Sequence, residues 1–326
     1  MIVYYDNHLD CYYAVPHRCG SSFTYDISQA APDRLRHHPD TYNYFTMAMM
    51  QLPKNSKVYI IYRDPVARYA SALEMVLSVR SGHKCEAALK DFIRNPDTVT
   101  DNIQKIIDLV EMDLITDFTM NDAHCLPAMA QCLFTQCAMS DDVEIQWVNL
   151  RNYTEFMKLR FLGHNDAVRE QVFQVSGPVK SVRVAHSWHN GPVTINGSMD
   201  PNEASIPASI LMEMLYKHTD LFTCRSLLTF DDWISSDVKC YDFIEKNPNF
   251  DKQDAVKFLS DVISADPYFL LRGNRYDFLH PEVLSSLDPS LQQSMKLAID
   301  SLPNTLLNIS GFSQLLVKLH DANLGS

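Results

Sequence analysis

Three short apolar segments, each followed by a helical pattern, constrain the fold of this chain more than any other feature. The segments are CYYAVP at 11–16, KVYIIY at 57–62 and VEIQWV at 143–148. Runs of this length that are rich in β-branched and aromatic residues are typical of buried strands. Strands that alternate with helices form a parallel sheet with helices on its faces. The sequence therefore predicts an α/β fold.

Ligands of such sheets bind at the carboxyl ends of the strands, which draws attention to the loops that follow them. The first loop, HRCGSS at 17–22, joins the strand 11–16 to a predicted helix. Backbone N–H groups in a glycine-containing turn at a helix start attract phosphate, and Arg18 adds a positive charge. A plain strand-to-helix turn is the alternative interpretation, because the Walker A pattern GxxxxGK[ST] is absent from the chain.

The second loop begins with Arg63-Asp64-Pro65, directly after the strand 57–62. Proline suits the first turn of a helix, and the predicted helix continues through Ser71. Arg63 and Ser71 lie eight residues apart around this helix start, so both can reach one phosphate, arginine as a bidentate fork and serine as a single donor. In the alternative interpretation, Arg63 pairs with Asp64 or a helix terminus and Ser71 is a small packing residue.

Together the two loops resemble those of sulfotransferases that use 3′-phosphoadenosine 5′-phosphosulfate (PAPS), and they are closest to the carbohydrate (Golgi-type) members. In that family a loop of the form [KR]-[ST]-G-[ST]-[ST] grips the 5′-phosphosulfate. PHRCGSSF at 16–23 is similar to it, with Cys19 in place of the usual Ser or Thr. The family's second motif, R-D-P-x-x-R-x-x-S, binds the 3′-phosphate. RDPVARYAS at 63–71 matches every fixed position of that motif.

Weaker similarities follow in the family's order. HCLP at 124–127 is similar to an H-x-x-P-Q segment, with Ala128 in place of Gln. INGS at 195–198, followed by DLF at 220–222, resembles the family's closing segment. The resemblance implies a P-loop-like sheet and the following donor-binding residues: Arg18, Cys19, Gly20, Ser21, Ser22, Phe23, Arg63, Ser71, Asn196 and Ser198.

The resemblance also implies a reaction, the transfer of a sulfuryl group from PAPS to a hydroxyl without a metal. Charge develops on the sulfuryl oxygens and on the leaving oxygen, and Arg18 is the predicted cation that stabilises it. In several carbohydrate sulfotransferases the general base is a histidine between the two motifs. RHHPDTYNYF at 36–45 resembles that segment and favours His38, with His37 second. Glu74 is a further candidate base, and each of the three has an alternative interpretation as solvated surface.

Composition narrows the range of partners. The formal net charge of −12 argues against a nucleic-acid partner, which needs a basic surface, and against a long polyanionic glycan. The expected acceptor is a hydroxyl on a glycan or a small molecule. Several basic side chains could form a rim for an anionic acceptor, although such residues usually belong to the solvated surface. They are Arg34, Arg36, Arg80, His83, Lys84 and Arg94.

Targeting signals are not apparent. The first ten residues lack a basic segment followed by an apolar core, and no apolar stretch approaches the ~20 residues that cross a bilayer. The eight cysteines form no CxxC pair, which favours buried or free thiols in a reducing compartment and gives no zinc site. The sequence therefore predicts a cytoplasmic protein without a membrane span.

The strand signal fades after about residue 226. This divides the chain into a predicted PAPS-binding domain at 1–228 and a helical C-terminal region at 229–326. Two other functions stay open at this stage, a nucleotide kinase or phosphotransferase on a similar sheet, and a non-catalytic nucleotide-binding scaffold. The missing Walker A lysine argues against the kinase, whereas Cys19 leaves room for the scaffold.

Overall fold

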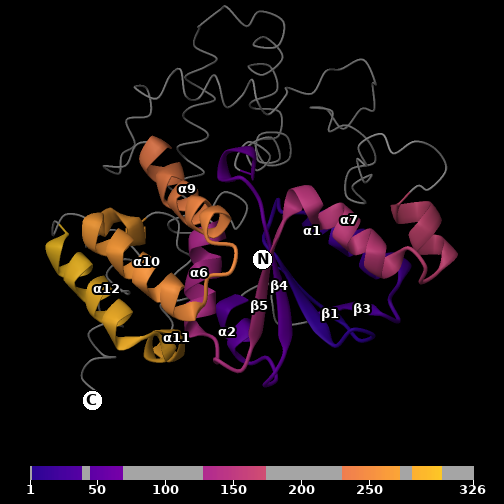
Figure 1. Ribbon diagram of the computed structural model, residues 1–326, viewed down its shortest axis with the longest axis horizontal. Helices are drawn as coiled ribbons and strands as arrows, with labels where there is room; N and C mark the ends of the chain where they lie inside the picture. The colour runs from indigo at the N-terminus through magenta and orange to yellow at the C-terminus, as the bar shows by residue number, and fades with distance from the viewer. Residues whose placement is uncertain (1, 39–44, 69–127, 174–229, 272–280, 303–326) are drawn as a thin grey trace, which may run out of the picture.

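The computed structural model describes residues 2–38, 45–68, 128–173, 230–271 and 281–302. Within these segments five strands form an open mixed sheet in the order β3-β1-β2-β4-β5 (Figure 1). Their bounds are Ile2–Asp6 for β1, Cys11–Val15 for β2, Leu35–His37 for β3, Lys57–Tyr62 for β4 and Glu144–Asn149 for β5. The fold is thus α/β, as the alternation of strands and helices predicts.

The predicted strands are β2, β4 and β5, and they are parallel neighbours. The sheet as a whole is mixed and not parallel, because β1 pairs antiparallel with both β2 and β3. β1 and β2 form a hairpin in which Asp6 pairs with Cys11. The Asp6 carboxylate accepts hydrogen bonds from the N–H groups of His8 and Leu9. Such local bonds from an aspartate to the backbone two and three residues further on favour a turn over a continued strand.

Side chains alternate between the two faces of the sheet, as the two-residue period of a strand requires. One face packs against α1 (Ser21–Ala30) and α7 (Leu150–Phe161), and the other against α2 (Phe45–Met50) and α6 (Ala128–Ala138) (Figure 1). The first face includes Tyr4, Tyr13, Val15, Tyr59 and Ile61. The second includes Val3, Tyr12, Ala14, Val58 and Ile60. The side chains on both faces are aromatic or aliphatic and are buried under these helices. The centre of the sheet is therefore buried on both sides.

The described C-terminal segments are helical, as predicted. They form α9 (Phe230–Lys246), α10 (Lys252–Ala265), α11 (Pro281–Ser286) and α12 (Pro289–Ser301), with a 3₁₀ turn at Pro267–Leu271. These helices lie beside α6, and their buried residues belong to the same hydrophobic cluster as those of α6 and of the first sheet face (Figure 1). The C-terminal helices therefore share a core with the sheet.

Two further observations bear on the sequence predictions. None of the helices in the described segments is long and apolar enough to cross a membrane. The cysteines that the structure describes are all buried, and they are Cys11, Cys19, Cys132, Cys137 and Cys240.

Candidate functional site

Both sequence motifs lie at the edge of the sheet where β2, β4 and β5 end, which we call the carboxyl edge (Figure 1). β2 continues into the turn 16–20 and β4 into Arg63 and Asp64, whereas β5 ends at Asn149 and is followed directly by α7. Three parallel strands place these ends side by side, as the sequence predicts.

Residues 16–20 form a tight turn between β2 and α1. The Cys19 N–H donates to the Pro16 carbonyl at 3.0 Å, and Arg18 and Gly20 have left-handed backbones with φ of 64° and 92°. Glycine adopts such a φ without steric cost. A Cβ at position 20 would also lie 3.0 Å from Cδ1 of Leu150 on α7. Both the turn and the close approach of α7 therefore require glycine at this position.

The start of α1 suits an anion. Gly20 is the N-cap and supplies no side-chain cap, and the first turn contains no acidic residue. The first N–H groups of a helix have no intrahelical acceptor and lie at the positive end of the helix dipole. Ser21 and Ser22 are partly exposed there, so their hydroxyls can add hydrogen bonds to a bound anion.

Cys19 and Phe23, two of the predicted donor-binding residues, direct their side chains into the core. Cys19 is fully buried, and burial raises the pKa of its thiol to about 12. The Phe23 ring makes edge-to-face contacts with Tyr153 and Phe173, at centroid distances of 5.9 and 5.8 Å. At the turn these two residues can therefore offer backbone groups only.

The second motif contacts the first directly. Arg63 Nη1 donates to the Arg18 carbonyl at 3.1 Å. The Asp64 carboxylate accepts from the Ala67 N–H at 2.8 Å and so caps the short helical stretch 65–68, which begins at Pro65 as predicted. The two loops that sequence reasoning placed at one edge thus touch through Arg63.

Four of the predicted site residues lie outside the described segments, and they are Ser71, Glu74, Asn196 and Ser198. The structure therefore brings together the part of the predicted site that comprises the turn, the start of α1 and Arg63.

The predicted histidines lie two strands away from the turn 16–20, at the end of β3 and directly after it. β3 runs parallel to β2, because both are antiparallel to β1, but it stops before the carboxyl edge. His37 pairs with Tyr4, and Tyr4 pairs with Tyr13 in the middle of β2. The His38 N–H donates to the Val3 carbonyl at 2.8 Å, and the His37 ring packs edge-on against Tyr4. Burial, with a smaller contribution from His38, lowers the pKa of His37. Two strand spacings separate β3 from β2, about 10 Å.

Sequence reasoning missed Glu245, which reaches the carboxyl edge from α9. Its Oε1 accepts hydrogen bonds from the Tyr62 hydroxyl and from Asn149 Nδ2, each at 2.7 Å. Burial and the Glu245 carboxylate raise the pKa of Tyr62. Asn149 also caps α7 by accepting from the Arg151 N–H. Glu245 is exposed and lies beside the strand end that leads into Arg63, so it adds negative charge next to the site.

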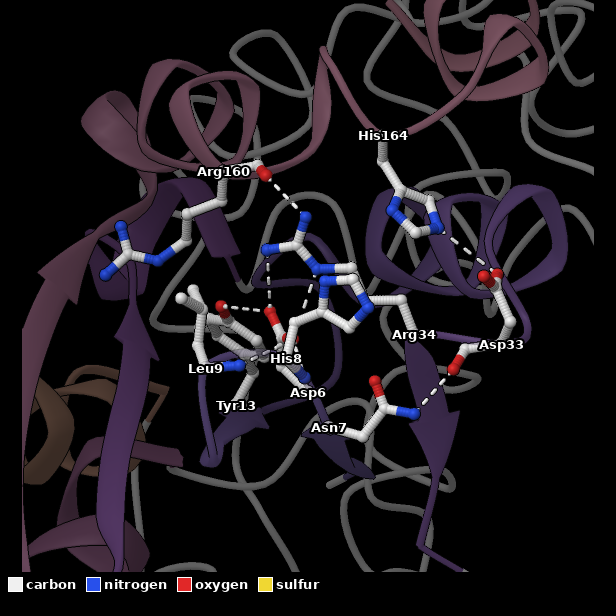
Figure 2. A network of polar contacts seen from close by, with 9 residues as sticks. All are labelled: Asp6, Asn7, His8, Leu9, Tyr13, Asp33, Arg34, Arg160 and His164. Atoms are coloured by element: carbon white, nitrogen blue, oxygen red, sulfur yellow. Dashed lines mark hydrogen bonds and ion pairs between the residues drawn. The ribbon is translucent and has the colours of Figure 1, made fainter.

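Arg34, predicted as part of a basic rim, belongs instead to a buried network at the opposite edge (Figure 2). Its Nε and Nη2 atoms each donate to the Asp6 carboxylate at 3.2 Å, and Nη1 donates to the Arg160 carbonyl at 2.6 Å. The guanidinium also lies 4.1 Å from the centre of the Phe161 ring. This arrangement ties the β1–β2 hairpin to α7.

Comparisons of the chain with protein-family models, with curated proteins and with solved structures find no match. Among the residues that the structure describes, no group of three or more His, Cys, Asp or Glu side chains is arranged to hold a metal ion.

Proposed function

We propose that this protein is a sulfotransferase of P-loop-like architecture that moves a sulfuryl group from PAPS to a hydroxyl of a carbohydrate or a small molecule. The observation that carries the proposal is the 3.1 Å contact between Arg63 Nη1 and the Arg18 carbonyl. It joins the two segments that resemble the PAPS-binding motifs of the family. Each segment alone is a common strand-to-helix turn, and their contact is what makes a bipartite anion site.

The residues at the turn fit the donor, which carries two phosphates and a sulfate. The 5′-phosphosulfate belongs at the start of α1, where the first N–H groups have no intrahelical acceptor and the first turn contains no acidic side chain. The 3′-phosphate belongs at Arg63, whose planar guanidinium can hold it by two parallel hydrogen bonds. We assign Ser71, Asn196 and Ser198 to the same donor by their place in the motifs.

When bound, PAPS supplies a sulfuryl group whose S–O bond to the 5′-phosphate breaks as a new S–O bond forms to the acceptor oxygen. Arg18 is proposed to stabilise the negative charge that develops during this exchange, together with the N–H groups at the start of α1. His38 is proposed to take the proton of the acceptor hydroxyl, with His37 and Glu74 as the alternatives. Burial lowers the pKa of His37, which favours the neutral ring that a base requires.

The acceptor is proposed to lie along the carboxyl edge between β2 and β3. The net charge of −12 disfavours a polyanionic acceptor by like-charge repulsion. A hydroxyl compound with little or no negative charge fits this environment best.

Ligand-dependent thermal stability tests the proposal. A ligand that binds only the folded state raises the unfolding temperature, so 3′,5′-diphosphoadenosine should stabilise the protein more than ATP does. Transfer of radiolabelled sulfate from PAPS to glycans, small alcohols, phenols and tyrosyl peptides then identifies the acceptor. Stabilisation by ATP alone would indicate a kinase. Stabilisation by 3′,5′-diphosphoadenosine with no transfer to any acceptor class would indicate a nucleotide-binding scaffold.

A further inference from the structure

Asp237, in the first half of α9, directs its carboxylate into the interior of the protein. The side chain is 3% exposed, and its oxygens accept hydrogen bonds from the N–H groups of Ala128, Met129 and Ala130 at 3.2, 2.6 and 3.2 Å. These are the first residues of α6, whose leading N–H groups have no acceptor within their own helix. Asp237 therefore supplies from another helix the acceptor that α6 needs.

The same carboxylate faces the second motif. Asp237 Oδ2 lies 3.7 Å from Nε of Arg68, and the Arg68 side chain is 2% exposed. Arg68 is the second arginine of the R-D-P-x-x-R pattern, and its N–H donates to the Asp64 carbonyl at 2.9 Å. A charge pair this deeply buried needs both partners, because either ion alone would be left without water.

Asp237 is thereby linked to the predicted phosphate ligand. Arg68 is the last described residue of the helical segment that Asp64 caps, and Arg63 precedes Asp64. Arg63 in turn donates to the carbonyl of Arg18 in the first loop. A displacement of Arg68 would shift the stretch that carries Arg63, and a misplacement of about 1 Å is enough to weaken a site of this kind.

We propose that Asp237 is a positioning residue, which holds the segment 63–68 against the start of α6 so that Arg63 meets the first loop. The donor site of the sulfotransferase is then supported by a helix from the C-terminal region. The structural role of Asp237 does not depend on the proposed function. Its effect on ligand affinity does depend on that function.

The first experiment measures amide hydrogen exchange in wild type and Asp237→Asn, which keeps the side-chain size and removes the charge. We expect faster exchange at residues 67 and 68 as well as at 128–130, and unchanged exchange in the β1–β2 hairpin. Asp242→Asn is the matched control, since Asp242 is an exposed acid of the same helix that bonds only to Lys246 among the contacts described. Faster exchange confined to 128–130 would reduce Asp237 to a helix cap and overturn the proposal.

The second experiment measures the affinity for 3′,5′-diphosphoadenosine by calorimetry in Asp237→Asn, Arg68→Gln and the double variant. We expect each single change to weaken binding at least tenfold, and the double variant to be no weaker than either, because residues that act through one contact are not additive. If the loss of affinity in the double variant equalled the product of the losses in the two single variants, the proposal would be overturned.

The two experiments also decide the case in which wild type binds no nucleotide and the case in which Asp237→Asn does not fold. If wild type binds no nucleotide, the proposed function fails, and the exchange experiment alone decides the role of Asp237. If Asp237→Asn does not fold, we expect the double variant to fold, because it removes both buried charges together. Failure of both variants to fold would show that Asp237 serves α6 independently of Arg68, contrary to the proposal.

Discussion

The two edges of the sheet use arginine in opposite ways. At the edge where β1 ends and β2 begins, Arg34 forms a bidentate pair with the buried Asp6 carboxylate, so its charge is neutralised inside the protein (Figure 2). At the carboxyl edge, the partly buried Arg63 donates to a neutral carbonyl, that of Arg18. The first arrangement stabilises the fold, and the second joins the two loops of the candidate site.

The largest effect should follow from Asp6→Ala, because it leaves the Arg34 charge buried without its carboxylate. We expect the free energy of unfolding to fall by about 3–5 kcal/mol, measured by urea denaturation. Asp166→Ala removes an exposed acid and serves as the control, with an expected change within about 0.5 kcal/mol. A loss under about 1 kcal/mol for Asp6→Ala would mean that the network adds little to stability.

Arg63→Ala should weaken the binding of the nucleotide and have little effect on the stability of the fold. Loss of a charge-assisted bidentate contact should weaken the binding of 3′,5′-diphosphoadenosine by about 2–4 kcal/mol, measured by calorimetry. Unfolding should change little. The control is Arg169→Ala, which removes the same group from an exposed position on the π-helical turn Val168–Val172. Unchanged affinity in Arg63→Ala would remove the 3′-phosphate assignment.

Gly20→Ala should have an intermediate effect. The left-handed backbone at φ 92° costs a residue with a Cβ about 1–2 kcal/mol, and the new atom would press on Leu150. Gly163→Ala is a matched control, because a Cβ added at Gly163 would meet no atom within 4 Å and the backbone there has no positive φ. Thermal unfolding should therefore show a lower melting temperature for Gly20→Ala than for Gly163→Ala, and equal melting temperatures would contradict the described turn.

The smallest effect concerns the surface pair Lys57–Glu144, in which the charged atoms lie 2.9 Å apart. The hydrogen bond to Lys57 lowers the pKa of Glu144, so the folded state favours the carboxylate. The resulting stability is present above the ordinary pKa of 4.5 and is lost as the pH falls below it. Because both side chains are about one third exposed or more, Glu144→Gln should cost less than about 1 kcal/mol at pH 7. The cost should vanish near pH 3 in urea denaturation, and a cost that persists there would exclude the ion pair as its source.

The sequence predicts the three parallel strands β2, β4 and β5 well, and it does not predict β1 and β3 on the other side of β2. β4 occupies the predicted residues 57–62, because an unbroken run of β-branched and aromatic residues strongly favours a buried strand. β3 has only three residues, with the buried, exposed and partly buried pattern of Leu35, Arg36 and His37, and such a segment has no detectable period. β1 and its antiparallel pairing likewise lie outside what the sequence predicts.

The same division holds for the candidate site. The meeting of the two loops follows from a rule about parallel strands, and it could be predicted without knowing any contact. The roles of Arg34, Asp237 and Glu245 depend on partners that lie far away in the sequence. Charged residues of this kind are expected at the surface until the fold supplies the partner, since burial of a charge leaves no local signal.

Because Glu245 and Asp237 complete the carboxyl edge from α9, the order in which the chain is synthesised has a consequence for folding. Asp6 and Arg34 are 28 residues apart, so this ion pair can form while most of the protein is still on the ribosome. Tyr62 and Glu245 are 183 residues apart, and their contact has to wait until α9 has emerged. Distant contacts also close more slowly than local ones. We therefore expect the Asp6–Arg34 pair to form first and the contacts at the carboxyl edge last, so that the candidate site is completed only after α9 has been synthesised.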